Sequence, residues 1–389
     1  MSGDAVLTYR IAAADPERAA EDVAAAAGAG RVAAVRPAAA PGGPLPAYAG
    51  AAPRGAEVDV AVALGTDLFA LLGAALAPFD LPQLAGVRLE AIRPPAALTA
   101  AAPGPAFGLP GTRRLLGVAD RPMVGSIIKP SVGLTPRQTA NRVRELGLAG
   151  IDFVKDDELM ADPPSSPFEE RVAAVMGAVR EVAATTGRTP MFAFNVSAHD
   201  PETIVARHDI VAEAGGTCVM VSLNQVGFAG VARLRAHATL PIHGHRNGWG
   251  ALTRDPAFGL DFRAYATLWR LAGVDQLHVN GIANKFWEPD DSVVAAVAAC
   301  REPLGDQPAL CPVVSSGQWG GQAPETYART GTIDVLYLAG GGIQGHPGGP
   351  AAGVRAIRAA WEAAVDGVPL AERARDVPEL AAALERFGG

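Results

Sequence analysis

The chain has 389 residues, 49% of them hydrophobic, which is enough for one large or two ordinary globular domains with sizeable cores. Its formal net charge of −7, without any basic run, argues against nucleic acid or membrane as a partner and favours a small molecule. Three scattered cysteines predict neither disulfides nor a zinc site. Because no signal peptide or membrane-length apolar stretch is found, we expect a cytoplasmic protein.

Residues 1–110 alternate between strand and helix signals and predict an α+β domain of the ferredoxin-like type. Residues 38–53 are rich in Pro, Gly and Ala and are expected to form a loop. Residues 94–111, with several prolines and little periodicity, are expected to connect this domain to the next. The predicted strands are 6–12, 32–37, 58–64 and 87–92, and the predicted helices are 16–27 and 68–76.

From residue 123 the pattern becomes a regular alternation of eight apolar strands, each followed by a helix, which predicts a (β/α)₈ barrel in a domain spanning 111–389. A doubly wound sheet is the alternative, but eight repeats favour closure. A last helix is expected over 368–387. The predicted strands are 124–128, 151–154, 191–196, 218–223, 241–245, 276–279, 310–314 and 335–339, and the helices between and after them are 136–148, 168–186, 202–214, 229–238, 262–272, 292–300, 325–330 and 351–365.

The strand ends carry the chemistry, because active sites of such barrels lie at the carboxyl ends of the strands. All eight predicted strands end in polar or glycine residues, which favours an enzyme over a purely structural barrel. These residues are Lys129; Lys155, Asp157 and Glu158; Asn195; Ser222 and Asn224; His243, His245 and Arg246; His278 and Asn280; Ser315, Ser316 and Gly317; and Gly340, Gly341 and Gly342.

The segment around Lys155 is the most informative. One lysine and three consecutive carboxylates follow a buried strand, and carboxylates this close repel one another unless a cation such as Mg²⁺ holds them. Asp157 and Glu158, at the turn, are better placed as ligands than Asp152 or Asp156. Only three lysines occur among 33 basic residues, so a lysine indicates a position that needs a reactive amine. Addition of CO₂ to the Lys155 amine would give a carbamate; an acidic helix cap is the simpler alternative.

The remaining strand ends complete a candidate site. Lys129 could move protons, or could simply extend from the barrel rim. The pair His243 and His245 would lie on one strand face, with Arg246 beyond them for a phosphate. The glycine-rich loops after strands 7 and 8 are typical phosphate-binding positions. Lys285 lies beside two aromatic residues in a loop that could close over a ligand.

These motifs resemble ribulose bisphosphate carboxylase (RuBisCO) and the RuBisCO-like proteins. The likeness runs from about residue 58 to 365 and rests on GSIIKPSVGLTP, GIDFVKDDE, HGHR, LHVNGIANK, VVSSG and AGGGIQGHPGG. By this resemblance Lys155 corresponds to the carbamylated lysine, and Asp157 and Glu158 to the other Mg²⁺ ligands. The resemblance also implies a dimer or an assembly of dimers.

The resemblance implies roles for the other strand-end residues as well. Lys129 matches the lysine that handles protons at the reacting carbons, and Lys285 matches the loop lysine that holds the CO₂-derived carboxylate. His245 matches an active-site histidine. The phosphate- and substrate-binding positions correspond to Arg246, His278, Ser315, Gly317, Gly340 and Gly341.

Departures from the family pattern argue against the carboxylase reaction itself. A second family lysine is Ser131 here, an amino-terminal asparagine is Ala77, and no counterpart of the family's Glu and Thr-Trp segment is found. The Trp-containing variants HRNGWGALTR, NKFWEPDDSV and SSGQWGGQAPETY resemble the RuBisCO-like proteins of apiose and isoapionate breakdown. The chain is therefore expected to be a RuBisCO-like protein of this group.

The leading functional hypothesis is a Mg²⁺-dependent enzyme acting on a phosphorylated keto-sugar acid through an enediolate. The resemblance implies decarboxylation, or carboxyl transfer or hydrolysis, of 3-oxo-isoapionate 4-phosphate. Three alternatives remain open at this point. They are an enolase or isomerase of a methylthio-keto-sugar phosphate, a Schiff-base aldolase using Lys155, and a non-catalytic binding barrel.

Overall fold

The computed structural model describes residues 3–28, 30–39 and 53–388, and most of the loop expected over 38–53 lies outside them. The chain forms two compact units. One contains residues 1–104, 248–273 and 302–307, and the other contains residues 105–247, 274–301 and 308–389. The proposed domain boundary near residue 110 stays a prediction.

The first unit is built on a ferredoxin-like sheet, as predicted. Strands β1 (Ala5–Ala13), β2 (Arg31–Pro37), β3 (Arg54–Val62) and β4 (Gly86–Arg93) lie in the order β4-β1-β3-β2 and pair antiparallel. The helices of this part are α1 (Pro16–Ala26), α2 (Leu68–Leu76), the short 3₁₀ helix η1 (Ala77–Asp80) and α3 (Ala96–Ala101).

A segment from far along the sequence extends this sheet. Strand β10 (Phe258–Leu260) pairs parallel with β4, and it lies between α9 (Trp249–Thr253) and α10 (Phe262–Leu271). Arg88 on β4 holds the segment, because its guanidinium donates to the carbonyls of Asp255 (2.6 Å) and Leu260 (3.2 Å). The helix predicted at 262–272 is therefore present, but it packs within the first unit, where the prediction had assigned it to the barrel.

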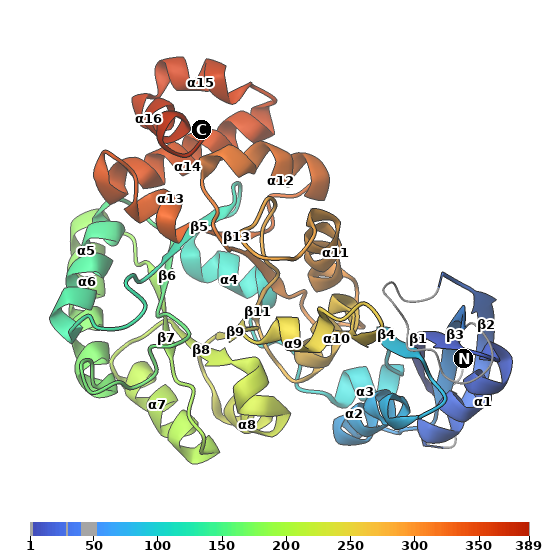
Figure 1. The fold of residues 1–389 in the computed structure, drawn as a ribbon. Helices are drawn as coiled ribbons and strands as arrows, with labels where there is room; N and C mark the ends of the chain where they lie inside the picture. Colours follow the sequence, from blue (N-terminus) through green and yellow to red (C-terminus); the bar gives the residue numbers. More distant parts are fainter. Residues whose placement is uncertain (1–2, 29, 40–52, 389) are drawn as a thin grey trace. The chain divides into compact units, whose positions relative to one another are not determined.

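The second unit is the predicted closed barrel of eight parallel strands (Figure 1). Their order around the ring is β5, β6, β7, β8, β9, β11, β12 and β13. The strands are β5 (Met123–Ile127), β6 (Phe153–Lys155), β7 (Met191–Asn195), β8 (Cys218–Ser222), β9 (Ile242–His245), β11 (Gln276–His278), β12 (Cys311–Val314) and β13 (Leu336–Leu338).

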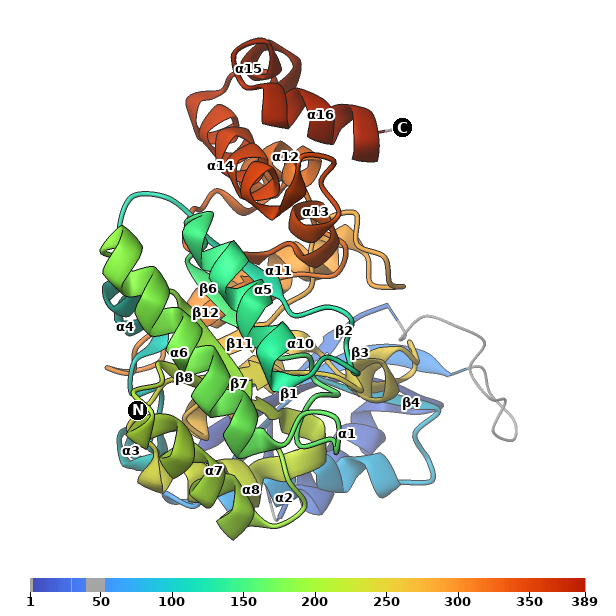
Figure 2. The same ribbon diagram turned by 90° about the vertical axis from the view of Figure 1, so that its left-hand side faces the viewer.

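Helices surround this ring, and Figure 2 shows α5 and α6 running side by side along its outside. The helices of the unit are α4 (Gly108–Leu116), α5 (Pro136–Leu148), α6 (Phe168–Thr186), α7 (Pro201–Glu213), α8 (Leu223–His237), α11 (Asp290–Arg301), the 3₁₀ helix η2 (Gly320–Gln322), α12 (Ala323–Thr330), α13 (Gly340–Gln344), α14 (Gly349–Asp366), α15 (Leu370–Asp376) and α16 (Pro378–Phe387). None of the helices in the described ranges is both long and apolar enough to cross a membrane.

One prediction about the segments flanking the barrel was wrong, and another missed two helices. The single helix expected over 368–387 is two helices, because Pro378 cannot continue α15 and instead begins α16. The connection expected over 94–111 contains α3 and the start of α4. Neither helix was predicted, because the prolines of this segment interrupt the hydrophobic periodicity on which helix prediction rests.

Helix α4 closes the amino-terminal end of the barrel. Leu109 and Leu116 on this helix, with Val118 after it, pack in one apolar cluster with inward-facing residues of six strands. The strand residues of that cluster are Met123, Phe153, Met191, Ala193, Cys218, Met220, Cys311, Val313, Leu336 and Leu338. The barrel interior is therefore a packed core, and only its opposite end is available to a ligand.

One buried carboxylate fastens α4 in place. Asp275, immediately before β11, accepts hydrogen bonds from the backbone N–H groups of Phe107 (2.6 Å) and Gly108 (2.9 Å) at the start of α4. It also accepts from the N–H of Ile242 (2.8 Å) and pairs with Arg235 (3.2 Å). Asp275 thus satisfies donors from three separate segments at the closed end of the barrel.

Asp275→Ala is expected to lower the free energy of unfolding by about 3–5 kcal/mol, because it leaves three backbone amides without an acceptor and the buried Arg235 guanidinium without its counter-ion. Asp275→Asn keeps one acceptor oxygen and should cost less. Urea unfolding measures both. The control is Asp306→Ala at an exposed aspartate, expected to change stability by less than about 0.5 kcal/mol. Equal stabilities for Asp275→Ala and the control would contradict this role.

Candidate active site

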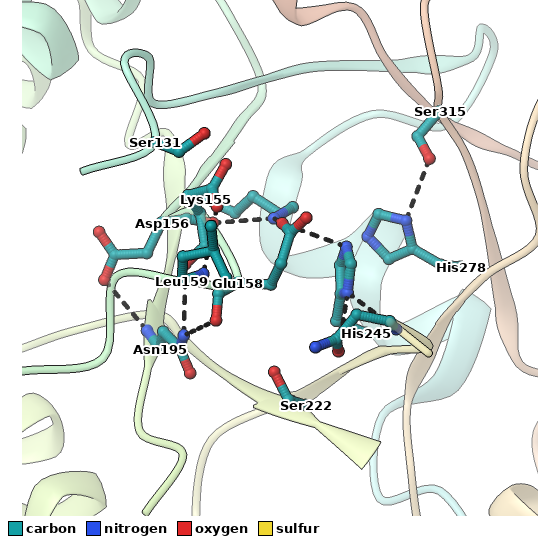
Figure 3. Close-up of polar contacts among 12 residues, drawn as sticks. Ser131, Lys155, Asp156, Glu158, Leu159, Asn195, Ser222, His245, His278 and Ser315 are labelled. Atoms are coloured by element: carbon teal, nitrogen blue, oxygen red, sulfur yellow. Dashed lines mark hydrogen bonds and ion pairs between the residues drawn. The ribbon is translucent and has the colours of Figure 1, made fainter. Parts of the chain in front are cut away.

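Lys155 lies at the carboxyl end of β6 with its side chain only 1% exposed (Figure 3). Its Nζ atom donates to the carbonyl of Asp156 (2.8 Å) and lies 3.5 Å from Oε2 of Glu158. The same Glu158 oxygen is 3.4 Å from Nε2 of His245, at the end of β9. Predicted residues from two different strands therefore meet around one carboxylate.

Burial controls the charge of these groups. Burial lowers the pKa of Lys155, although the carboxylates of Glu158 and Asp157 oppose the shift, so this lysine gives up its proton more readily than an ordinary one. Burial also lowers the pKa of His245 to about 4, so the imidazole is neutral at pH 7. Burial would raise the pKa of Glu158, but His245, which is protonated in the acid range where Glu158 titrates, and Lys155 outweigh it and lower that pKa to about 2.

Lys129 and Asp157 form the second part of the cluster. Nζ of Lys129, after β5, donates to Oδ2 of Asp157 (2.6 Å) and to the hydroxyl of Ser131 (2.7 Å). Oδ1 of Asp157 accepts from the backbone N–H of Leu159 (3.1 Å). The Lys129 side chain is 47% exposed, so it reaches the open end of the barrel while it neutralises Asp157.

The neighbouring carboxylate of Asp156 points away from this cluster. It is fully buried, and its Oδ2 accepts from Nε of Arg171 on α6 (3.3 Å) and from the backbone N–H of Asn195 (3.1 Å). The Arg171 guanidinium also donates to the carbonyls of Ser166 (2.6 Å) and Ala161 (2.5 Å). Arg171 therefore fixes the loop that follows the cluster, a role for which its place in an amphipathic helix gave no signal.

Asn195, at the end of β7, shapes the turn that carries the carboxylates. Its Nδ2 donates to the carbonyls of Asp157 (3.2 Å) and Glu158 (3.0 Å), and its Oδ1 accepts from the N–H of Ser197 (3.1 Å). The sequence placed Asn195 at a strand end but assigned it no role. Its strand-end position was the only available signal.

A chain of buried hydrogen bonds links the neighbouring strands β9 and β11 to the end of β12. Nδ1 of His243 lies 2.8 Å from Oε1 of Gln276, and Nε2 of His243 lies 2.9 Å from Nε2 of His278. Nδ1 of His278 lies 3.1 Å from Oγ of Ser315, the end of the chain. Burial lowers the pKa of both histidines well below the usual range, so both rings are neutral.

The hydrogens in this chain point in one direction. The Gln276 amide donates through Nε2 to Thr112, so its oxygen must accept from Nδ1–H of His243. Nε2 of neutral His243 then accepts from Nε2–H of His278, and Nδ1 of neutral His278 accepts the hydroxyl hydrogen of Ser315. The oxygen of Ser315 is therefore left as a hydrogen-bond acceptor, and the hydroxyl oxygen of Ser316 lies 3.4 Å from it.

Arg246 follows His245 and is buried against a carboxylate that the sequence interpretation did not include. Its Nη2 lies 2.5 Å from Oε2 of Glu288 and its Nη1 lies 3.4 Å from Oε1. The exposed fractions of the two side chains are 8% and 2%. The guanidinium predicted to hold a phosphate is thus paired within the protein.

The loops after β11, β12 and β13 contain the other predicted residues. Lys285 is exposed, its backbone N–H donates to the carbonyl of Ser316 (3.2 Å), and its ammonium lies 5.2 Å from the centre of the Phe286 ring. Gly317 has a φ of +90°, a conformation that favours glycine, and its Cα lies beside the Lys285 side chain. Gly340 and Gly341 begin α13, and a Cβ placed on Gly341 would meet nothing within 4 Å.

Backbone strain gathers at the same loops. Within the described ranges, the non-glycine residues with positive φ are Asn280 (75°), Ala283 (47°) and Ser316 (75°). All three lie in the loops after β11 and β12. Such conformations cost of order 1–3 kcal/mol each and concentrate at functional sites, which supports a function for this end of the barrel.

A group of metal-ligand type lies elsewhere, where α7 approaches the end of α8. It consists of His208, Asp209 and His237. The backbone N–H of Thr239 donates to Nε2 of His208 (3.1 Å), so Nδ1 carries the hydrogen and donates to Asp209 (3.0 Å). His237 contacts the same carboxylate oxygen (2.6 Å). We interpret the group as hydrogen bonds between two helices, because the His208 nitrogen that faces it is protonated.

The closed barrel, with a buried lysine among carboxylates at the carboxyl ends of its strands, defines a barrel enzyme of the α/β class. The sequence profile of the ribulose bisphosphate carboxylase large chain, catalytic domain, matches residues 108–387. The chain therefore belongs to the RuBisCO large-chain family.

Named relatives lie within this family. The chain is 52% identical over 339 residues to a 3-oxo-isoapionate-4-phosphate decarboxylase of Rhizobium etli, an alignment covering 85% of this chain and 81% of the relative. It is 53% identical over 308 residues to a 3-oxo-isoapionate-4-phosphate transcarboxylase/hydrolase of Xanthobacter autotrophicus, covering 79% and 74%. The crystal structure of a RuBisCO-like protein from Burkholderia fungorum superposes with a TM-score of 0.95 at 40% identity, covering 99% and 100%.

The pKa of His245 predicts a loss of stability in acid. The folded value of about 4 lies below the ordinary 6.5, so between these pH values only the unfolded chain binds the proton. Stability should be fully present above pH 6.5 and should fall by up to about 3 kcal/mol as the pH drops to 4. Urea unfolding across this range is expected to show a flatter profile for His245→Asn. The exposed His199→Asn should follow the unmodified protein, and parallel profiles for all three would refute the assignment.

Proposed function

We propose that the protein is a carboxy-lyase that releases the carboxyl group of 3-oxo-isoapionate 4-phosphate. The observation that carries the proposal is the buried Lys155 amine beside Glu158, with Asp157 in the same turn, in a chain that is more than half identical over the aligned residues to proteins named for this substrate. The relative named as a transcarboxylase/hydrolase makes transfer or hydrolysis of the same carboxyl group the second candidate.

The residues around Lys155 fit a divalent cation. Two carboxylates and an amine whose pKa is lowered by burial form the donor set, and the amine is suited to carbamate formation because its neutral form is accessible. Lys155 as its carbamate, Asp157 and Glu158 would hold Mg²⁺. When bound, the ion supplies positive charge beside a keto-acid oxygen. Asp156 is excluded from the set because Arg171 holds it on the far side of the turn.

A 3-oxo acid has its ketone on the second carbon from the carboxyl carbon, so loss of CO₂ moves the bonding electron pair towards the ketone oxygen and leaves an enolate, which is an enediolate where the carbon that loses CO₂ carries a hydroxyl group. The side chains of this chain position that substrate. Lys285, on its exposed loop, binds the carboxylate, and the loop backbone of Gly317, Gly340 and Gly341 receives the phosphate. His278 and Ser315 contact the sugar portion of the substrate.

The reaction also needs a proton at the carbon that loses CO₂. Lys129 is the proposed donor, because its ammonium is held by Asp157 and Ser131 at the open end of the barrel. Lys129 donates its proton to that carbon and regains one from solvent, to which 47% of its side chain is exposed. We expect the enzyme to work in the cytoplasm as a homodimer or an assembly of dimers.

Lys155→Met is expected to reduce turnover of 3-oxo-isoapionate 4-phosphate by about 1,000-fold or more, because the carbamate and its charge are lost. Release of labelled CO₂ from carboxyl-labelled substrate, followed by mass spectrometry, measures turnover and separates decarboxylation from hydrolysis. The variant should be at least as stable as the unmodified protein, since a buried amine is replaced by an apolar chain of similar length. Full activity of Lys155→Met in EDTA would end the proposal.

Lys285→Ala tests the loop lysine separately. The Lys285 ammonium attracts the negatively charged carboxylate of the bound acid. As CO₂ forms, the carboxylate loses its negative charge, so this contact is stronger with the bound substrate than in the transition state. We expect KM to rise by about 10–100-fold with a smaller change in kcat. Lys285→Arg keeps the charge and should largely restore KM. A variant with unchanged KM and strongly reduced kcat would contradict this role.

A further inference from the structure

Glu288 is the most completely bonded carboxylate near the open end of the barrel. Besides both contacts to Arg246, its Oε2 accepts from Nδ2 of Asn280 (2.8 Å) and its Oε1 accepts from the hydroxyl of Ser292 (3.1 Å). Each oxygen thus accepts two donors, and the side chain is 2% exposed. The carboxylate is built into the protein, and Arg246 supplies the charge that compensates it.

This pairing changes what Arg246 offers to a ligand. A guanidinium bound through two nitrogens to a buried carboxylate presents a pair with no net charge. A phosphate dianion could bind Arg246 only by displacing Glu288 or by lying beside it. Displacement would leave a buried carboxylate without its counter-ion, and the second arrangement sets like charges side by side. A hydroxyl group encounters neither cost.

The pair and the proposed phosphate loops follow different strands of the ring. In the barrel order, β9, which Arg246 follows, stands two places from β12, which precedes Gly317, and three places from β13, which precedes Gly340. Ser315 follows β12, which stands between β9 and β13 in the ring, and its oxygen is left as an acceptor because its hydrogen is committed to His278. The buried pair of Arg246 and Glu288 itself suits a neutral, hydroxyl-bearing group better than a second phosphate.

We propose that Glu288 is a specificity-determining residue that cancels the charge of Arg246, so that the site accepts a keto-sugar acid with one phosphoryl group and rejects a bisphosphate. The proposal rests on the proposed function, because it assigns the single phosphate to the glycine loops. It differs from a purely structural role, in which Glu288 only anchors the loop that carries Lys285. An anchor would affect monophosphates and bisphosphates alike.

The test compares binding of ribulose 5-phosphate and ribulose 1,5-bisphosphate by calorimetry. Glu288→Gln keeps the shape of the side chain and uncovers the charge of Arg246. It is expected to bind the bisphosphate about tenfold tighter or more than the unmodified protein, with a smaller change for the monophosphate. The double variant Arg246→Gln/Glu288→Gln removes both charges and should lose this gain. Glu325→Gln, at an exposed glutamate on α12, controls for the change in net charge.

The proposal is overturned if folded Glu288→Gln gains no preference for the bisphosphate, or if the double variant keeps the gain. Where Glu288→Gln does not fold, Glu288→Asp retracts the carboxylate from Arg246. It should then show a smaller gain of about threefold, and no gain would overturn the proposal equally. Turnover of 3-oxo-isoapionate 4-phosphate by the unmodified protein is measured separately. If this turnover is absent, the proposed function is wrong. The ratio of the binding constants for the bisphosphate and the monophosphate still tests the role of Glu288.

Discussion

The removal of Lys155 from water is the constraint on which the site depends. An amine in a side chain with 1% exposure is costly to charge, and the carboxylates of Glu158 and Asp157 only partly offset that cost. The turn after β6 has to bring those two carboxylates towards the amine and turn Asp156 away. Asn195 holds the carbonyls of the turn and Arg171 holds Asp156, so the adjoining strand and helix set the geometry.

Carboxylates at the two ends of the barrel have different kinds of partner. At the closed end, Asp152 binds Arg121 and the N–H of Val124, and Asp275 binds the start of α4, so these carboxylates are saturated by permanent partners. At the open end, Asp157 and Glu158 are held by Lys129, Lys155 and His245, whose charges depend on protonation. Saturated carboxylates stabilise the barrel, whereas the others can change partners when a ligand arrives.

The sequence predicted the barrel because each strand and its helix have their own periodicity, and it placed Lys155, His245 and Ser315 together because parallel strands end at one edge. It could not predict features that depend on long-range packing. Strand β10 pairs with β4 from a distant segment, and α4 is hidden by prolines. Glu288 lies in a polar loop, and only the folded chain shows that it meets Arg246. Alternation and motif spacing contain no information about such partners.

The direction of the buried hydrogen-bond chain decides which groups beside the opening donate and which accept hydrogen bonds. An amide cannot exchange its donor and acceptor by moving a proton, so Gln276 fixes the tautomers of His243 and His278. The hydroxyl hydrogen of Ser315 is thereby committed to His278, and its oxygen is left as an acceptor. The neutral pair of Arg246 and Glu288 arises from a separate interaction, and Arg246 follows β9, two strands from β12 in the ring. Each feature disfavours an anion beside it and favours a group that donates a hydrogen bond.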